Sequence, residues 1–452
     1  MDTANPIASA KPGVNVTPGD AKPGVNAAPD VGAKPRVKTW LQKLGPGLIT
    51  GAADDDPSGI ATYSQVGAMF GYSMMWVMLF SLPLMIAIQE VCARIGRVTG
   101  MGIAANMRKH YPAPLLYAIV SLLCLANIFN LGADLGAMGA AAQMLFGGGL
   151  IAYVIGFAVV SLLLQVYIRY TQYVKYLKWL TLALFAYVLT PFVARVAWGH
   201  ALRSTLIPSV TFNVAYFTAL VAVLGTTISP YLFFWQASEE AEDVRDNRKE
   251  HPLKWAPWQA RKQFERIKVD TVVGMGFSNA VALFIILTTA ATLHAAGITD
   301  IQTSAQAAKA LEPLAGRFAF ELFALGIVGT GLLAVPVLAG SAAYGVAEAF
   351  KWRACLEDRP AQAKQFYGVL AVATLIGLGL NFVGINPIRA LFWSAVINGV
   401  VSVPLMVVTM FMGANPKVMG QFTLPLRLRI VGWIATVVML VASIGLFVTL
   451  GR

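Results

Sequence analysis

The residues best suited to chemistry are three consecutive aspartates, Asp54, Asp55 and Asp56, in an otherwise apolar segment. Pro57 follows them directly, and a proline has no backbone N–H to donate within a helix. The helix is therefore expected to break here, which leaves carbonyl groups unpaired before the break and N–H groups unpaired after it. Carboxylates together with freed carbonyls form an anionic, oxygen-rich site of the kind that suits a hard cation.

A structural reading of the aspartates is also open, because Asp56 can be the N-cap of a helix that has Pro57 at its first position. The two roles are compatible. Capping needs one carboxylate, whereas three carboxylates in an apolar segment are costly and normally face a cavity or a partner. We therefore expect Asp56 to bind a cation, with Asp54 and Asp55 raising the local negative potential.

Residues 213–237 repeat this design, with an apolar half, a break and a second short half. The break is the run Gly225-Thr226-Thr227-Ile228-Ser229-Pro230. Broken helices in equivalent positions of two halves are typical of inverted-repeat transporters, which bind their substrate between the breaks. Further oxygen ligands, or groups that hold the waters of the ion, are expected from the carbonyls and threonine hydroxyls of Ala53, Gly225, Thr226 and Thr227.

Bulk composition indicates an integral membrane protein. Of the 452 residues, 57% are apolar and only 12% are charged, and the mean hydropathy is +0.66. Soluble domains carry about 25% charged residues, so a soluble chain of this composition would expose large apolar patches and aggregate. Since one spanning helix needs about 20 apolar residues, the chain has room for roughly a dozen spans.

The apolar runs predict an all-α protein with about 11 transmembrane helices, of which helices 1 and 6 are broken. With the N-terminus inside, 28 of the 34 Lys and Arg residues fall on the cytoplasmic side, as the positive-inside rule requires. Topology therefore explains the basic excess, and no nucleic-acid partner is expected. The expected spans are 45–71, 73–95, 112–145, 148–168, 178–197, 213–237, 269–296, 318–350, 366–385, 387–412 and 424–450.

The N-terminal segment differs from the rest of the chain. AKPGVN occurs at 10–15 and again at 21–26, and AKPRVK occurs at 33–38. A segment so rich in Pro, Gly and Ala cannot bury enough surface to fold. We expect a disordered cytoplasmic tail over 1–38 and a transmembrane transporter domain over 39–452. The expected parts of this domain are a first repeat over about 45–197, a second over about 213–412 and an extra helix over about 424–450.

Polar residues in the third and tenth spans extend the candidate site. Asn127, Asn130 and Asp134 share one face of the third helix. This stripe predicts either an ion or proton pathway or hydrogen bonding between helices, and both interpretations stay open. Asn398, in the last span of the second repeat, is counted with the candidate metal-binding residues, although hydrogen bonding between helices would also explain it.

Four other carboxylates lie near the ends of spans, where solvation costs little. Glu90 and Arg94 are four residues apart on one helix, so we expect them to form a structural ion pair. Asp270, Glu321 and Glu348 are expected at the membrane interface, where they need no partner inside the bundle.

Three segments resemble the Nramp family of divalent metal transporters. GPGLITGAADDDPSG, at 45–59, resembles the first helix of the family, and Asp56 and Pro57 fall on its signature Asp and Pro. QEVCARIGRVTG, at 89–100, and GADLGAMGAAAQMLFG, at 132–147, resemble the ends of the second and third helices. The resemblance implies a leucine-transporter-like fold, in which helices one to five and six to ten form an inverted 5+5 repeat.

The departures from the family pattern bear on the ion. They are Gly59 in place of the signature Asn, Ile228-Ser229-Pro230 in place of the Met-Pro-His motif of the sixth helix, and Ala137 in place of an acidic residue. Without the soft thioether, an all-oxygen site suits Mg²⁺ or Mn²⁺. The missing His and acidic residue are groups associated with proton coupling. The chain therefore resembles the Nramp-related magnesium transporter branch.

We expect a divalent metal cation transporter of the Mg²⁺ and Mn²⁺ class that works by alternating access, without tight proton coupling. It is expected to be a multi-pass protein of the inner cell membrane, with a cytoplasmic N-terminus and an external C-terminus. The metal ion is the substrate, no cofactor is expected, and the lipid bilayer is the other partner. A monomer or loose oligomer is expected, and an enzymatic function is not.

Two other functions remain open for this sequence. One is a symporter of the same fold that carries an organic solute such as an amino acid together with a cation, although three aspartates at the midplane would repel a carboxylate substrate. The other is an intramembrane aspartyl protease that uses Asp56 and Asp134, although Asp56 lies in a broken helix.

Overall fold

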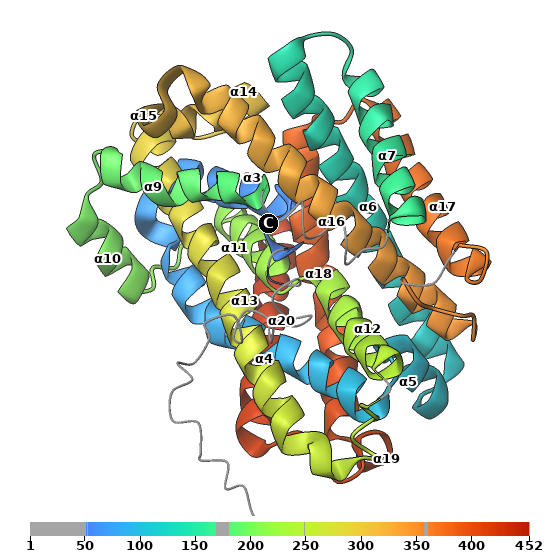
Figure 1. The fold of residues 1–452 in the computed structure, drawn as a ribbon. Coiled ribbons are helices and arrows are strands. Elements are labelled where there is room, and N and C mark those ends of the chain that lie inside the picture. The colour runs from blue at the N-terminus through green and yellow to red at the C-terminus, as the bar shows by residue number, and fades with distance from the viewer. Residues whose placement is uncertain (1–50, 52, 169–179, 248, 357–359, 452) are drawn as a thin grey trace, which may run out of the picture. The chain divides into compact units, whose positions relative to one another are not determined.

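The computed structural model describes residues 51, 53–168, 180–247, 249–356 and 360–451. All regular secondary structure in these ranges is helical, as the composition predicts, and Figure 1 shows the arrangement of the helices. The expected tail over 1–38 lies outside the described residues, so its disorder stays a prediction.

Nine spans in the described part of the chain are long and apolar enough to cross a membrane, and each corresponds to a predicted span. They are α4 (Trp76–Thr99), α6 (Ala113–Phe146), α7 (Leu150–Tyr167), the broken pair α11 (Val214–Thr227) and α12 (Pro230–Asp246), α13 (Ala260–Thr289), α16 (Ala319–Ala349), α17 (Lys364–Leu380), α18 (Pro387–Ala414) and α20 (Leu426–Leu450). The other two predicted spans, the first and the fifth, overlap residues that the structure does not describe.

The region of the fifth predicted span differs from the expectation. The helix α9 (Phe185–Val193) ends before Arg195, whose charge interrupts the apolar run. A helix that the sequence did not predict, α10 (Trp198–Leu206), follows after a bend of 119°. Because α10 exposes large apolar side chains such as Leu202, it has the character of a helix that lies at the membrane interface.

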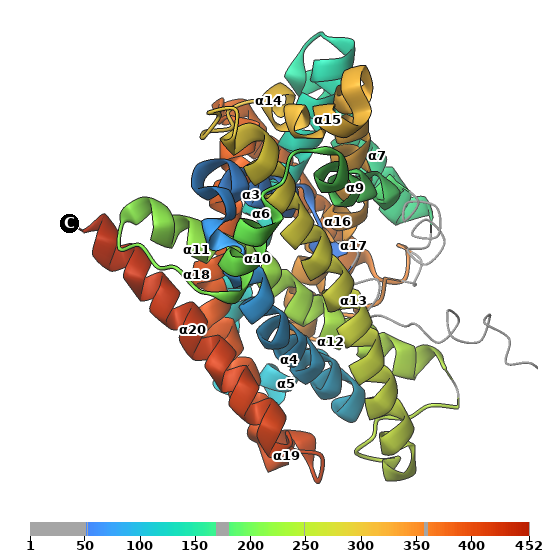
Figure 2. The ribbon, with the colours of Figure 1, turned by 90° about the vertical axis from the view of Figure 1, so that its left-hand side faces the viewer.

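Contacts between the spans divide most of them into two sets. The helices α6, α7, α16 and α17 pack against one another, as Figure 1 shows on its right-hand side. In the other set, α4 packs against α13 and both halves of the broken sixth span, and α13 packs against α3 (Pro57–Phe70). The helix α18 contacts both sets, and α20 runs along α11, α18 and α4 (Figure 2). The broken helices therefore belong to one set and the polar stripe of α6 to the other.

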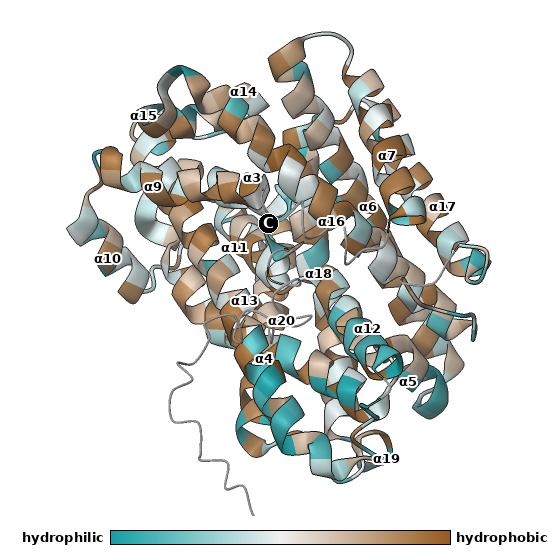
Figure 3. Ribbon diagram, in the orientation of Figure 1, coloured by the Kyte–Doolittle hydropathy of each residue, from teal (hydrophilic) through white to brown (hydrophobic). Residues whose placement is uncertain are grey.

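Shorter helices connect the spans, and hydrophilic residues gather at one end of the bundle. Figure 3 shows this end where the labels of α12 and α5 lie, in contrast to the largely hydrophobic spans. Loops rich in Lys and Arg lie at this end, and its location in the cytoplasm stays a prediction of the positive-inside rule. The shorter helices are α5 (Ile103–His110), α14 (Ser304–Ala308), α15 (Glu312–Ala315) and α19 (Pro416–Met419).

The helix α3 is tied to a neighbouring loop through its polar side chain Gln65. The amide of Gln65 donates to the Thr299 carbonyl at 3.3 Å and accepts from the Ile301 N–H at 2.9 Å. One turn further on, the Nδ1 atom of His294 lies 2.7 Å from the Ala68 carbonyl oxygen. The half-helix after the first break is therefore fixed to the segment that follows α13.

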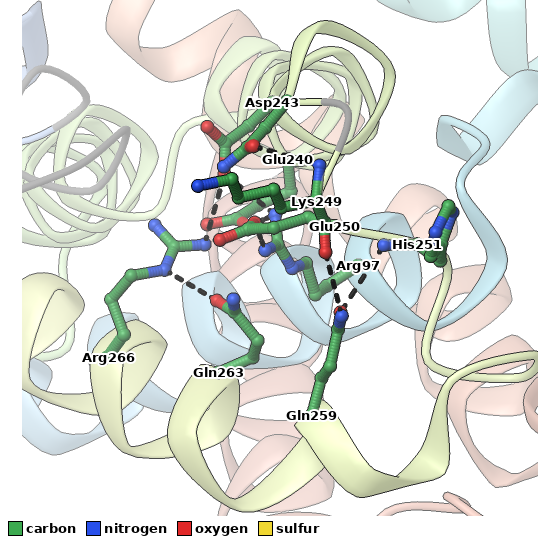
Figure 4. Close-up of polar contacts among 10 residues, drawn as sticks. Arg97, Glu240, Asp243, Lys249, Glu250, His251, Gln259, Gln263 and Arg266 are labelled. Atoms are coloured by element: carbon green, nitrogen blue, oxygen red, sulfur yellow. Dashed lines mark hydrogen bonds and ion pairs between the residues drawn. The ribbon is translucent and has the colours of Figure 1, made fainter. Parts of the chain in front are cut away.

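The corresponding half of the sixth span, α12, is tied down by an ion-pair network centred on Arg97 of α4 (Figure 4). The Arg97 side chain is fully buried, and it pairs with Asp243 at 2.7 Å and with Glu240 at 3.8 Å. It also pairs with Glu250 in the loop after α12. Arg266 of α13 reaches Glu240 at 2.5 Å. The network thus joins α4, α12 and α13.

Replacing Arg97 with Gln is expected to destabilise the protein strongly, because it leaves the buried Glu240 carboxylate with one cation fewer. Removing one partner of a buried ion pair costs about 3–5 kcal/mol of unfolding free energy. Thermal unfolding of the purified protein in detergent measures the loss.

Arg261→Gln is the matched control, because the Arg261 side chain is 94% exposed and its ion pair with Glu265 contributes about 0–1 kcal/mol. Equal melting temperatures for Arg97→Gln and Arg261→Gln would contradict a stabilising role for the network.

Candidate cation site

The first break forms where the sequence predicts it. Helical residues end at Asp54, and α3 begins at Pro57 with Asp56 as its N-cap, in an extended conformation with φ −72° and ψ 171°. The Asp56 carboxylate accepts hydrogen bonds from the Gly59 N–H at 2.7 Å and the Ser58 hydroxyl at 2.8 Å. The predicted capping role is therefore confirmed.

The second break also forms as predicted, between Thr227 at the end of α11 and Pro230 at the start of α12. The Ser229 hydroxyl contacts the carbonyl oxygens of Gly225 at 2.9 Å and Thr226 at 2.8 Å. The Thr227 hydroxyl donates to a carbonyl within α11. The carbonyl groups of Gly225 and Thr226, which the sequence predicts as ligands, therefore accept a hydrogen bond from a neutral hydroxyl group.

The two breaks touch each other. The Tyr231 hydroxyl, at the start of α12, donates to the Ala53 carbonyl before the first break at 3.0 Å. A Cβ atom placed on Gly59 would lie 3.1 Å from the Thr226 hydroxyl oxygen. A Cβ atom at Gly59 would therefore require the Thr226 side chain to shift by a few tenths of an ångström, so the two breaks pack closely at this position.

A polar cluster joins the first break to the third and tenth spans. We call it the Asp56 cluster; its members are Asp56, Ser58, Asn130, Asp134 and Asn398. The Asn130 amide nitrogen contacts the carboxylates of Asp56 at 2.8 Å and Asp134 at 3.1 Å. The Asn398 amide nitrogen donates to the Asn130 amide oxygen at 2.8 Å. The cluster thus connects α3, α6 and α18 through buried side chains.

The other two aspartates turn to a different partner. The Ser278 hydroxyl, on α13, lies 2.6 Å from a carboxylate oxygen of Asp54 and 3.0 Å from one of Asp55. Both side chains are at most 2% exposed. Because one hydroxyl carries one hydrogen, Ser278 can fully satisfy only one of these carboxylates at a time. The three consecutive aspartates therefore divide between the Asp56 cluster and Ser278.

Several oxygen atoms around this region are buried without a hydrogen-bond partner. They are one oxygen each of Asp54, Asn127, Asp134 and Asn398. Among the described residues, no three side chains of His, Cys, Asp or Glu come together as a metal-holding group. Buried acceptors that lack donors call for an ion or water between them. The arrangement suits a cation that keeps part of its water shell and is held by few carboxylates.

The structure brings four of the eleven predicted site residues together in one cluster and gives the others different partners. Asp56, Asn130, Asp134 and Asn398 meet in one cluster, whereas the Asn127 amide donates to a carbonyl of α16 at 3.0 Å. The sequence interpretation missed the following contributors: Ser58, Tyr231 and Ser278. A lone hydroxyl in an apolar helix is common and gives no signal of its own, so only the folded arrangement reveals these three.

The remaining carboxylate predictions have mixed outcomes. Glu90 and Arg94 form the expected ion pair at 2.8 Å, and Glu321 is exposed. The expectation for Asp270 is wrong, because its side chain is buried at 1% exposure. Asp270 acts electrostatically on Arg266 of the Arg97 network, so an attractive charge compensates its burial. Glu348 is half-buried and hydrogen-bonded rather than freely interfacial.

Comparisons with known proteins show the family of the chain. Residues 47–449 match the family described as natural resistance-associated macrophage protein-like, or Nramp. The chain is 27% identical to the divalent metal cation transporter MntH of Klebsiella pneumoniae (strain 342) over 429 residues. This alignment covers 92% of the chain and 95% of the Klebsiella protein.

Solved structures show the same fold. The Eremococcus coleocola manganese transporter, in complex with an aromatic bis-isothiourea substituted compound, is similar with a TM-score of 0.72 and 17% identity, over 90% of this chain and 87% of that chain. Mhp1, a nucleobase-cation-symport-1 family transporter, is similar with a TM-score of 0.57 and 12% identity, over 90% and 92% of the two chains. The predicted leucine-transporter-like fold, with broken helices 1 and 6, is confirmed.

Gly225→Ala is expected to disturb the second break, because a Cβ atom at Gly225 would overlap the Ala395 carbonyl and the Gly399 nitrogen of α18. Such overpacking costs about 1–3 kcal/mol, and thermal unfolding in detergent measures it. Gly276→Ala is the control, since nothing lies within 4 Å of a Cβ atom there and alanine is the better helix former by about 1 kcal/mol. If Gly225→Ala proved as stable as Gly276→Ala, the close approach of α11 and α18 would be wrong.

Proposed function

The chain belongs to the Nramp family of divalent metal transporters, and from this premise we propose that it carries a partly hydrated Mg²⁺ or Mn²⁺ ion. In this proposal the ion binds Asp56 at the break before α3, and Asp54 and Asp55 supply negative potential from the Ser278 side. Asn130, Asp134 and Asn398 orient the Asp56 carboxylate and bind waters of the ion. The metal is the transported substrate, and no cofactor takes part.

The main support for this proposal is that three carboxylates are buried and that their hydrogen-bond donors are electrically neutral. The donors to the carboxylates of Asp54, Asp55 and Asp56 are hydroxyl, amide and backbone N–H groups. Ionised carboxylates inside a bilayer are costly unless a cation or protons compensate them. A divalent cation at this point would neutralise two of the charges and meet the acceptor oxygens that lack donors.

The choice between ions rests on the chemistry of the donors. The atoms of the Asp56 cluster that could bind a cation are oxygens, among them the carboxylate oxygens of Asp56 and Asp134, and oxygen-rich sites suit Mg²⁺ and Mn²⁺. Mg²⁺ loses its waters reluctantly and is bound through one or two carboxylates with several waters kept. Asp56 contacts the Asp56 cluster whereas Asp54 and Asp55 contact Ser278, and this division is consistent with an ion bound by few carboxylates. Mn²⁺ is proposed as well because one of the similar structures is a manganese transporter.

Transport in this proposal follows alternating access, with the N-terminus in the cytoplasm. The half-helices α3 and α12 are each fixed beyond their break, α3 through Gln65 and α12 through the Arg97 network. Opening toward the outside must release the Gln65 contacts, and opening toward the cytoplasm must release α12 from the Arg97 network. Ala137 is an apolar residue on α6 beyond Asp134, so transport is proposed to proceed without tight proton coupling.

Asp56→Asn is expected to reduce Mg²⁺ and Mn²⁺ uptake into proteoliposomes by at least 100-fold, because the charged ligand is lost while the capping oxygen remains. Glu265→Gln, a change at a 69% exposed side chain, is the control and should transport normally. Unchanged uptake by Asp56→Asn would overturn this site assignment. Competition by amino acids but not by divalent ions would favour the organic-solute symporter instead.

Ser229→Met is expected to shift the preference from Mg²⁺ toward Mn²⁺, because it places a soft thioether at the second break. The measurement is the ratio of Mn²⁺ to Mg²⁺ uptake in proteoliposomes, which should rise several-fold. Ser229→Leu has a side chain of similar size without sulfur and should leave the ratio near that of the unchanged protein. An equal ratio for the two variants would place Ser229 away from the ion.

A further inference from the structure

A basic cavity of about 320 Å³ lies at the end of the bundle that carries the Arg97 network. Three elements enclose it: the α4–α5 turn with α5, the end of α12, and the segment that follows α16. Its charged lining residues are Arg108, Arg245, Glu348, Lys351 and Arg353. Arg353 has other interactions in the structure, and the remaining three cations, Arg108, Arg245 and Lys351, share the cavity with a single carboxylate.

The carboxylate in the lining is already engaged by the protein. Glu348 accepts hydrogen bonds from the Ala105 N–H of α5 at 3.0 Å and from the Ser238 hydroxyl of α12 at 3.1 Å. A Cβ atom on Gly102 would overlap the Glu348 carboxylate, so this group lies directly against the start of α5. The carboxylate thus lies at the helix terminus, where it is favourable, and it also attracts Arg245 and Arg108 electrostatically.

The two arginines nearest the helices bind mainly backbone oxygens. Arg108 donates to the Glu348 carbonyl, and Arg245 donates to the Ala354 carbonyl at 3.2 Å. Arg245 also has a longer ion pair with Glu242, at 3.7 Å. Carbonyl oxygens hold a guanidinium in place without neutralising it, and a guanidinium has five donors. Positive potential therefore remains in the cavity.

Lys351 provides an independent reason to regard the cavity as a binding site. Among the described residues it is the one non-glycine residue with a positive φ, of 62°. It ends α16 in a left-handed turn closed by the Trp352 N–H on the Ala347 carbonyl at 2.8 Å, a position that glycine normally occupies. A lysine is kept where the backbone favours glycine, and the lysine lines the cavity. A backbone outlier that lines a cavity is a reason to test the residue for a role in binding.

The surroundings of the cavity indicate the source of the anion. Next to it, Phe350 stacks on Trp352 with ring centroids 5.1 Å apart, and Tyr117 lies 5.6 Å from Phe350. All three rings are substantially exposed, and exposed aromatic groups at the end of a span are typical of the headgroup region of a membrane. Basic pockets between helices at this level bind anionic headgroups.

We propose that this cavity binds the phosphate group of an anionic phospholipid through Lys351, Arg108 and Arg245. Because Ala241 and Arg245 of α12 line the cavity together with α5 and the end of α16, the bound phosphate joins the second half of the broken sixth span to the helices around it. The proposal concerns a site separate from the Asp56 cluster and does not depend on which ion is transported.

The test is native mass spectrometry of the full-length protein, titrated with phosphatidylglycerol, with phosphatidylcholine, and with inorganic phosphate. We expect phosphatidylglycerol to be retained in preference to phosphatidylcholine. Lys351→Gly should lower its apparent affinity by roughly fivefold, the contribution of one cation near an anionic headgroup. The same variant should melt no lower than the unchanged protein, because glycine suits the backbone at this position.

Arg427→Gln is the matched control, since Arg427 is an exposed cation on α20 away from the cavity. If Arg427→Gln lowered phosphatidylglycerol binding as much as Lys351→Gly, general surface charge would explain the effect and the site would be refuted. Equal retention of phosphatidylglycerol by Lys351→Gly and the unchanged protein would also refute it. If inorganic phosphate bound as tightly, and Lys351→Gly weakened it, the phosphate site would stand and a soluble phosphate would be its ligand.

Discussion

Burying three adjacent carboxylates in an apolar bundle is the constraint on which the rest of this structure depends. An ionised carboxylate at membrane depth must be compensated, and the donors that reach Asp54, Asp55 and Asp56 are neutral. The break at Pro57 helps, because it gives Asp56 the free N–H of Gly59. Neutral donors do not cancel negative charge, and our proposal is that the transported cation does so when it is bound.

The surrounding architecture serves this site by holding the two breaks against each other. Asn130 links the carboxylate at the first break to α6, and Asn398 links α6 to α18. Tyr231, at the start of α12, donates a hydrogen bond to the Ala53 carbonyl and so joins the second break to the first. The two half-helices beyond the breaks are held by different interactions. Neutral hydrogen bonds of Gln65 hold α3, and buried ion pairs of Arg97 hold α12. The two fastenings can therefore be released separately.

The sequence was sufficient for features that depend on local chemistry. Pro57 and Pro230 mark the breaks because each lacks an N–H, and the Asn130 and Asp134 spacing places both on one helical face. It was insufficient where distant helices meet. Nothing in the local sequence pairs Asn398 with Asn130, or turns Asp54 and Asp55 toward Ser278, since these contacts depend on how the helices pack. The end of α9 before Arg195 and the separate helix α10 were also missed, because a short helix at the membrane interface has no apolar run of spanning length.

The most direct test of the central claim is the position of a bound ion. Crystals of the protein soaked in Mn²⁺ should give an anomalous difference peak beside the Asp56 carboxylate, between the breaks that start α3 and α12, and excess Mg²⁺ should remove it. A peak elsewhere in the bundle, or none beside Asp56 at saturating Mn²⁺, would contradict the account.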